Sequence, residues 1–408
     1  MRTLVFAPAA YNFAETIRMV EVAKACRDNF RVIFTSYGGN FEWLIKEEDF
    51  PLIPTQPRLS PQKIDRLYRI MRWDLINYPF AVDHLTERVQ GELQWLEALK
   101  PAAVVTGLDL SWPISCRVAG VPLVWVAQTT FLAHYWHSHL ATWPDFLDYA
   151  PLRVMPEKFL NFLARYLMHF NRLVMKPFNA TARRFGARPF KHHEFWEGNY
   201  TLLAEPREFS GLNRFPSHYH FIGPLVARLD RDIPPEVESL PRDLPLIYFA
   251  MGSSGDARIV AEILEGFAGK PYRVIAPVKK LLQGLSVDIP PNVLVTDWLP
   301  AHKVNPMAQV SVIHGGLGTV MTACLSGTPI VGVGMHFEQE ANLECVARKG
   351  FALRLRKRRV TPSQVMAGVD RLLDDPVAQQ RAREFKQILE QYDGPANAAR
   401  FLTQTFGT

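Results

Sequence analysis

Short apolar runs alternate with stretches of helical spacing over the first part of the chain. Apolar runs of about four to eight residues are typical of buried strands, and apolar residues three or four apart are typical of one helix face. The runs predict strands over 4–8, 30–36, 102–106 and 123–127, with helices over 17–26, 87–99 and 112–119. Strands that alternate with helices in this way build a parallel sheet covered on both faces.

The segment 129–197 interrupts this rhythm and is rich in Trp, Tyr, Phe and His. Between 159 and 174, apolar residues recur at helical spacing, with Asn, Arg and His between them and Lys158 directly before them. Three interpretations stay open: an amphipathic helix that covers a core, the wall of a pocket, or a helix that lies on a membrane surface.

The alternation of strands and helices resumes after 229–245, a proline- and charge-rich stretch that is expected to be a linker. Strands are expected over 246–250, 272–276, 293–295, 310–313 and 330–333. The chain therefore has the pattern of two doubly wound α/β halves, which bind ligands beyond the carboxyl ends of their strands. The expected divisions are an N-terminal domain over 1–228, the linker over 229–245, a C-terminal domain over 246–376 and a helical segment over 377–408.

Composition narrows the class of protein. A length of 408 residues suggests two or three domains, and 48% hydrophobic with 21% charged residues is typical of a globular protein. The apolar runs are too short for membrane spans and the start lacks a cleavable signal, so a cytoplasmic protein is expected. Four scattered cysteines are expected to be reduced core thiols. The net charge of +6 could favour anionic substrates or an anionic membrane surface, and it is too weak to indicate nucleic-acid binding.

A glycine-rich turn follows the predicted strand 310–313. His314 ends the strand, three glycines free the backbone to approach a ligand, and a helix is expected to begin near Thr319. The start of a helix carries unpaired N–H groups and a partial positive charge, which suits a diphosphate. A second turn, from Gly252 through Ser253 and Ser254, follows the strand 246–250 and is expected to contact phosphate in the same way.

The turn belongs to a longer pattern: HGGLGT at 314–319, SGTP at 326–329, EQEAN at 338–342, with DWLP at 297–300 and FIGP at 221–224. This pattern resembles the donor signature of the family 1 glycosyltransferases, the UDP-glycosyltransferase-like group of the bacterial type. The resemblance is strong over 246–353 and fainter over the first 130 residues. It implies a GT-B architecture, in which two Rossmann-like domains face a cleft, the first binding the acceptor and the second the nucleotide sugar.

The resemblance also implies roles for individual donor-site residues. Trp298 and Leu299 would flank the base, and Glu338 and Gln339 would bind the sugar hydroxyls. The residues expected around the diphosphate are Gly252, Ser253, Ser254, His314, Gly316, Gly318 and Thr319. The chain departs from the family pattern at Ala301, where Gln is frequent, and at Thr322, where a Glu usually grips the ribose. The donor nucleotide therefore stays open between UDP and dTDP.

Inverting sugar transfer needs a base that takes the proton of the acceptor hydroxyl. The family's Gly-His-x-x-Pro turn is absent, and its His position falls on Glu15, which is the candidate base. Asn12 and Glu15 also have the spacing of a capping box, in which Glu15 would only close the helix start. Asp109 resembles the acid that orients the family's His. With Glu15 in place of that His, the two nearby carboxylates would raise the pKa of one of them, and the expected one is Glu15. Its alternative role is to cap the helix predicted at 111–119.

The expected function is inverting, metal-independent transfer of a sugar from UDP or dTDP to the hydroxyl of a hydrophobic small-molecule or lipid acceptor. No cofactor is expected beyond this donor, because the helix start and His314 would stabilise the leaving diphosphate. Asp230 and Asp232 spell a metal-binding Asp-x-Asp, but they lie in the linker and are expected to be solvated, as is the basic run 354–359. Peripheral membrane contact stays open, with a lipid-binding patch as the alternative for the run 354–359, and no nucleic-acid partner is expected. The alternative is a non-catalytic GT-B-like binding or activator protein.

Overall fold

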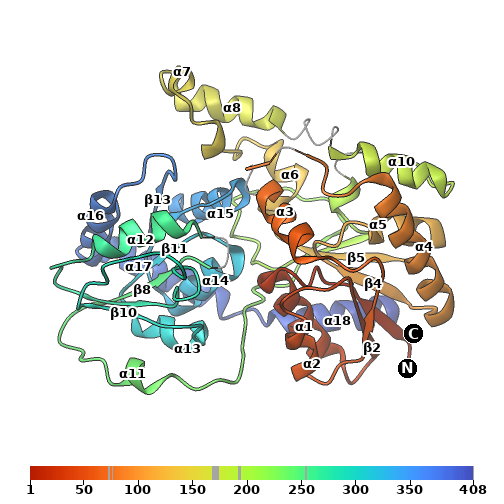
Figure 1. Ribbon diagram of the computed structural model, residues 1–408, viewed down its shortest axis with the longest axis horizontal. Coiled ribbons are helices and arrows are strands. Elements are labelled where there is room, and N and C mark those ends of the chain that lie inside the picture. Colours follow the sequence, from red (N-terminus) through yellow and green to blue (C-terminus); the bar gives the residue numbers. More distant parts are fainter. Residues whose placement is uncertain (72–73, 76, 168–173, 192–193, 253–254, 408) are drawn as a thin grey trace. The chain divides into compact units, whose positions relative to one another are not determined.

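The computed structural model describes residues 1–71, 74–75, 77–167, 174–191, 194–252 and 255–407. The chain forms two compact units. The first unit contains residues 1–141, 157–225 and 392–408, and the second contains 142–156 and 226–391. Each unit is built on one parallel sheet with helices packed against it (Figure 1).

The sheet of the first unit has seven strands in the order β3-β2-β1-β4-β5-β6-β7. These strands are β1 (Thr3–Phe6), β2 (Arg31–Ser36), β3 (Leu52–Pro54), β4 (Ala103–Thr106), β5 (Leu123–Ala127), β6 (Tyr200–Leu203) and β7 (Tyr219–Phe221). β1 pairs with both β2 and β4, so the strand order reverses between β1 and β4. In doubly wound sheets this reversal opens a crevice at the carboxyl ends of the two strands.

Two groups of helices pack on this sheet (Figure 1). One group holds α1 (Phe13–Cys26), α2 (Trp43–Glu47) and α18 (Gly394–Phe406), and the other holds α4 (Val82–Leu99), α5 (Trp112–Ala119) and α10 (Lys176–Arg184). Right-handed crossovers that leave the reversal in opposite directions place their helices on opposite faces. Further helices among the described residues are α3 (Pro61–Met71), α6 (Ala133–Trp136) and α8 (Glu157–Leu167), with the 3₁₀ turns Thr129–Phe131 and Glu194–Trp196.

The sheet of the second unit has six strands in the order β10-β9-β8-β11-β12-β13. They are β8 (Leu246–Ala250), β9 (Arg273–Ala276), β10 (Val293–Val295), β11 (Val310–Ile313), β12 (Ile330–Val333) and β13 (Ala352–Leu355). The strand order reverses between β8 and β11. The helices of this unit are α7 (Ala150–Arg153), α11 (Pro235–Glu238), α12 (Ala257–Glu265), α13 (Ala301–Val304), α14 (Leu317–Ser326), α15 (Phe337–Ala347), α16 (Pro362–Leu373) and α17 (Pro376–Leu389), with 3₁₀ turns at Asp145–Leu147 and Asn305–Met307.

The expectation of two doubly wound α/β halves is confirmed, while the division of the chain differs in detail. The expected terminal helical segment consists of two helices, of which α17 belongs to the second unit and α18 to the first. The break has a local cause, because the Asp393 side chain accepts a hydrogen bond from the Ala396 N–H and starts a new helix. α18 then packs against α1, and Phe401 and Phe406 contact the Tyr200 ring.

Residues 142–156 were expected in the N-terminal domain and instead belong to the second unit. Their acidic side chains pair with the basic run 354–359. The Arg354 guanidinium lies 2.8 Å from Asp145 and 3.3 Å from Glu340, and Arg359 pairs with Asp148. The expectation that this run is a solvated edge is therefore wrong for Arg354, whose side chain is only 7% exposed. Ion pairs between residues 209 and 211 positions apart in the sequence therefore hold the segment 142–156 against the second unit.

Other expectations concern scattered polar groups. All four cysteines are buried and free, as expected. Asp230 and Asp232 are exposed, as expected for solvated linker residues. In the part of the chain that the structure describes, no group of three His, Cys, Asp or Glu side chains is arranged to hold a metal ion. Likewise, no described helix combines the length and the apolar character that a membrane crossing requires.

Candidate functional site

The glycine-rich turn after β11 leads directly into α14. Gly315 has a φ of +86°, and a Cβ atom there would lie 2.6 Å from the Gln339 carbonyl oxygen, so only glycine fits. Gly316 is the N-cap of α14, and no side chain caps the helix. The first N–H groups of a helix have no partner within the helix, so this start is suited to bind an anion.

The His314 ring is packed between two glycines. A Cβ atom at Gly252 would lie 2.6 Å from Cε1 of the ring, and one at Gly316 would lie 2.7 Å from Nε2. His314 Nδ1 is 3.3 Å from the Ala250 carbonyl oxygen, and burial lowers the pKa of His314 to about 4. The ring is therefore neutral near pH 7 and donates from Nδ1, because a carbonyl oxygen can only accept. Nε2 becomes a donor only when the ring is protonated, which a bound diphosphate would favour.

The start of α15 brings two further candidates to the same turn. Asn342 donates to the Gly315 carbonyl oxygen at 3.0 Å and to the Glu338 carboxylate, so it ties α15 to the glycine turn. The Gln339 amide oxygen accepts a hydrogen bond from the Met335 N–H at 2.9 Å. Glu338 and Gln339 are both buried, and their orientation is set by these bonds.

The remaining donor candidates lie on neighbouring loops of the second unit. Trp298 is 43% exposed on the loop after β10, whereas Leu299 is buried. Gly318 has open space where a Cβ atom would lie, and Thr319 is half-buried beside it. Ser253 and Ser254 lie outside the described residues. The contacts therefore join Gly252, His314, Gly316 and the start of α15 at the reversal point of the second sheet.

In the first unit, Glu15 connects the loops that follow β1 and β4. Its Oε2 accepts a hydrogen bond from the Ala9 N–H at 2.6 Å, and its Oε1 accepts one from the Gly107 N–H at 3.0 Å. Asn12 caps α1 by accepting from the Glu15 N–H, but the Asn12 N–H donates to the Ala9 carbonyl oxygen instead of to Glu15. Only half of the expected capping box forms, so closing the helix start is not what the Glu15 side chain does.

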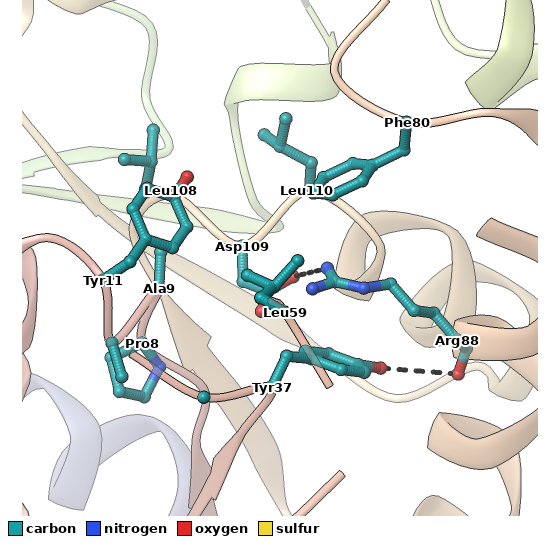
Figure 2. A pocket seen from close by; sticks show the side chains of 12 residues that line it. Pro8, Ala9, Tyr11, Tyr37, Leu59, Phe80, Arg88, Leu108, Asp109 and Leu110 are labelled. Atoms are coloured by element: carbon teal, nitrogen blue, oxygen red, sulfur yellow. Dashed lines mark hydrogen bonds and ion pairs between the residues drawn. The ribbon is translucent and has the colours of Figure 1, made fainter. Parts of the chain in front are cut away.

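Asp109 lies in a buried ion pair. Arg88 Nη1 is 3.0 Å from Asp109 Oδ1, and the guanidinium lies over the rings of Tyr37 and Phe80 (Figure 2). Asp109 Oδ1 also lies 3.2 Å from Ser111 Oγ and 3.5 Å from the Ser111 N–H. The expected cap of α5 is therefore a long contact, and the ion pair with Arg88 is the shorter one.

Arg88 and Glu92 belong to the same network and were not identified as candidates from the sequence. Glu92 accepts hydrogen bonds from the Tyr37, Ser111 and Ser115 hydroxyls. Both residues point from α4 into a core that also contains Leu85, Val89 and Leu96. Charged residues four apart on the apolar face of a predicted helix are the signal that could have found them.

Burial dominates the electrostatics of these carboxylates. It raises the pKa of Glu15 to about 8, against the opposing effects of Arg18 and of the Ala9 N–H, and the nearby Asp109 adds a smaller increase. Burial likewise raises the pKa of Glu92 to about 7 and raises the pKa of Asp109, which Arg88 opposes. The expected rise for Glu15 is present, but its main cause is burial and not Asp109.

A small cavity adjoins this network (Figure 2). It leaves about 10 Å³ for the centre of a water-sized molecule, which is close to the space that one water needs. Asp109 and Arg88 line it, and Glu15 does not. Its other walls are aromatic and aliphatic, among them Tyr11, Tyr37, Leu59, Phe80, Leu108 and Leu110.

Comparison with known proteins places the chain among sugar-transferring relatives. Residues 271–402 match the family described as "Erythromycin biosynthesis protein CIII-like, C-terminal domain". The PGL/p-HBAD biosynthesis rhamnosyltransferase of Mycobacterium bovis is 29% identical over 71% of this chain and 64% of its own length. The chain thus spans just under two thirds of that relative. The NDP-glycosyltransferase YjiC of Bacillus subtilis is 26% identical over 48% of this chain and 51% of its own.

Solved structures share the whole fold. The spinosyn forosaminyltransferase SpnP has a TM-score of 0.73 at 18% identity and covers 100% of both chains. The glycosyltransferase VinC, in complex with dTDP, has a TM-score of 0.67 at 18% identity and covers 98% of this chain and 99% of its own. At such low identity these likenesses concern the fold alone, and they show the GT-B architecture expected above.

Proposed function

The chain belongs to the family 1 glycosyltransferases, the UDP-glycosyltransferase-like group, and from this premise we propose that it is an inverting glycosyltransferase that needs no metal ion. It transfers a sugar from a nucleotide diphosphate to the hydroxyl of a hydrophobic acceptor. The observation that carries the proposal is the uncapped start of α14, reached through a turn that only glycine can form, with His314 packed beside it.

The diphosphate of the donor would lie at the first N–H groups of α14. These groups and a protonated His314 would stabilise the charge that develops on the leaving diphosphate, which is the task of the metal in other transferases. Thr322 stands where the family usually has a Glu for the ribose, and its hydroxyl donates to the Gly318 carbonyl oxygen at 2.8 Å. This favours dTDP over UDP, because thymidine lacks the hydroxyl that such a Glu would bind.

The chemical step requires a base on the acceptor side. The acceptor oxygen attacks the anomeric carbon, the bond from that carbon to the diphosphate oxygen breaks with its electron pair, and the hydroxyl proton passes to a carboxylate. The buried pair Glu15 and Asp109 supplies this carboxylate, supported by the raised pKa of both groups. Attack from the side opposite the leaving group inverts the configuration at the anomeric carbon.

The acceptor is a hydrophobic molecule or a lipid, and α8 supports contact with an apolar surface. Leu160 and Ala164 pack inward, whereas Phe159, Phe162 and Tyr166 are 47%, 44% and 53% exposed. Lys158 adjoins Phe159 in the sequence and the Arg165 guanidinium lies over the Phe162 ring, as in helices that bind anionic membranes peripherally. The part of the predicted helix over 168–173 lies outside the described residues.

The experiment that tests the donor site is thermal unfolding of the full chain with UDP, dTDP, GDP and their sugars, with and without EDTA. A ligand that binds only the folded protein raises its stability by about 2.7 kcal/mol at a concentration one hundred times its Kd. We expect a higher melting temperature with dTDP-linked sugars, unchanged by EDTA. Equal melting temperatures with every nucleotide would contradict the proposal.

A non-catalytic binding or activator protein is the second candidate. The observation in its favour is Glu15, whose carboxylate is buried and bonded to two backbone N–H groups. The two candidates differ in turnover: a binding protein would show the nucleotide-induced increase in melting temperature but release no nucleoside diphosphate from the donor when hydroxyl acceptors are added.

A further inference from the structure

The two candidate carboxylates have different surroundings. Both oxygens of Glu15 already accept backbone hydrogen bonds, one from Ala9 and one from Gly107, and the side chain is 1% exposed. A base must come within about 2.6–3.2 Å of the proton that it takes. Glu15 does not line the cavity of Figure 2, so an acceptor hydroxyl in that cavity has no direct access to it.

Asp109 does line that cavity. Its Oδ1 is engaged with Arg88 and Ser111, while its Oδ2 receives no hydrogen bond from the residues that the structure describes. The space available suits one oxygen atom, either of a water or of a hydroxyl. Asp109 therefore combines an unused oxygen with room for a hydroxyl beside it.

Arg88 keeps Asp109 in this orientation. The guanidinium carbon lies 3.5 Å from the centre of the Tyr37 ring and 4.6 Å from that of Phe80. The Tyr37 hydroxyl in turn donates to Glu92, one helical turn beyond Arg88. Such a buried ion pair rarely improves stability over apolar residues, so its presence beside a cavity points to function.

We infer that Asp109 is the catalytic base, that the cavity beside it receives the acceptor hydroxyl, and that Glu15 and Arg88 are positioning residues. This inference rests on the proposed function. As the acceptor oxygen bonds to the anomeric carbon and the diphosphate leaves, the hydroxyl proton passes to Asp109 Oδ2. The cavity has room for the hydroxyl and not for the body of the acceptor, and its aromatic walls, which include Tyr11, suit a hydroxyl carried on an aromatic ring, that is, a phenol.

Charged and titratable groups face Asp109 from several elements. Arg88 and Glu92 lie on α4, Glu15 on α1, Tyr11 on the loop after β1, and Tyr37 after β2. Burial raises the pKa of Asp109, and the Arg88 charge lowers it. Loss of the Arg88 charge should therefore move the acidic limb of the pH–rate profile to higher pH, whereas Arg88→Lys should leave it near its original position.

The test compares two acceptor probes at a pH where 4-nitrophenol is ionised and 4-methylphenol is not. An ionised acceptor needs no base, so the loss of the base should matter for 4-methylphenol alone. We expect Asp109→Asn to lower kcat with 4-methylphenol by roughly 10²–10⁴-fold and with 4-nitrophenol by less than about 10-fold. Glu15→Gln should lower both rates by the same factor, because it acts through the loops. Released nucleoside diphosphate and glycoside are both measured.

Folding is controlled within the same experiment. Retained transfer to 4-nitrophenol shows that the Asp109→Asn protein is folded. The double variant Asp109→Asn with Arg88→Gln removes both charges, leaves no unpaired buried cation, and should show the same selective loss. Equal losses for both phenols in these variants would overturn the assignment of the base, as would a selective loss in Glu15→Gln.

The outcomes also separate this inference from the function on which it rests. A wild-type protein that binds no nucleotide would overturn the proposed function together with the base. A wild-type protein that binds a nucleotide sugar and transfers to neither phenol would overturn only the assignment of the cavity to a phenolic hydroxyl.

Discussion

The two candidate sites occupy equivalent places in their sheets and use opposite chemistry. In the first unit, the Glu15 carboxylate joins the loops after β1 and β4, where the strand order reverses. In the second unit, His314 after β11 contacts Ala250 at the end of β8, where the order of that sheet reverses. The first site is made of buried carboxylates, and the second of glycine backbone, a helix start and one neutral ring.

The difference reflects the two tasks of the sites: the second site would bind an anion, and the first would accept a proton. An anion is bound by N–H groups that need no compensating charge, so the second site requires close backbone approach and little else. A proton acceptor must keep a buried negative charge, so the first site needs a cation and several hydroxyl donors around it. Damage to the first site should therefore affect stability and chemistry, whereas damage to the second should affect binding.

The largest effect is expected from Arg88→Met. It leaves Asp109 without its buried cation and should lower the free energy of unfolding by about 3–5 kcal/mol. Nucleotide binding by the second unit should persist in whatever fraction stays folded. Urea unfolding followed by circular dichroism measures the loss.

The matched control for Arg88 is Arg184, which also forms an ion pair with helix α4. Arg184 pairs with Asp83 of α4 at 3.0 Å, but its side chain is 53% exposed and that of Asp83 is 93% exposed. Arg184→Met should change stability very little, because exposed ion pairs are weak. Similar losses in the two variants would mean that burial of the Arg88 network is not what gives it its effect.

A smaller and different effect is expected from Gly318→Ala. A Cβ atom at Gly318 meets nothing within 4 Å, so the melting temperature should be kept or slightly raised. A diphosphate at the start of α14 would meet this methyl group, and nucleotide affinity should fall at least about 10-fold, or about 1.4 kcal/mol. Calorimetric titration with dTDP and UDP measures the change.

Gly316→Ala is the comparison for this variant. Its Cβ atom would lie 2.7 Å from His314 Nε2, so the ring must move and both stability and binding should decrease. Undiminished nucleotide binding in Gly318→Ala would place the diphosphate away from the start of α14.

A change of pH should affect the stability of the two sites in opposite directions. The pKa of Glu15 rises from 4.5 to about 8 on folding, so the folded state holds an extra proton between these values. Its contribution to stability therefore falls as pH rises from 4.5 to 8. The pKa of His314 falls from 6.5 to about 4, so its contribution is lost as pH falls from 6.5 to 4.

Glu15→Gln and His314→Gln should each flatten one of these slopes. Urea unfolding at several pH values between 4.5 and 8 measures both, with the unsubstituted protein as reference. A wild-type slope in Glu15→Gln would show that Glu15 does not titrate with a raised pKa.

Much of the second unit could be predicted from the sequence, because its signals are local. The turn from His314 to Thr319 is one continuous segment. The glycine conformation at Gly315 and the uncapped helix start both depend on residues within this segment. The sequence indicated that His314 can donate a hydrogen bond, but it did not show which ring nitrogen is the donor. The contact of His314 with Ala250, across 64 residues, decides which ring nitrogen carries the proton.

The first unit was harder to predict, because its site is assembled from distant segments. Glu15 reaches Gly107 across 92 residues, and Arg88 reaches Asp109 across 21. The spacing of Asn12 and Glu15 correctly indicated the helix start. The Glu15 carboxylate, however, accepts hydrogen bonds from the Ala9 and Gly107 N–H groups and not from the Asn12 N–H. Arg354 was likewise expected to be solvated, but in the structure it is buried and paired with Asp145.

By itself, the sequence determined the alternation of strands and helices, the two doubly wound halves and the glycine turn at the start of α14. These features depend on residue spacing and backbone conformation, which neighbouring residues control. Only the tertiary structure decided that Asp109 lines the cavity, that Glu15 is held between two loops and that residues 142–156 pack with the second unit. Burial and charge pairing decide such features, and both depend on segments that meet only when the chain has folded.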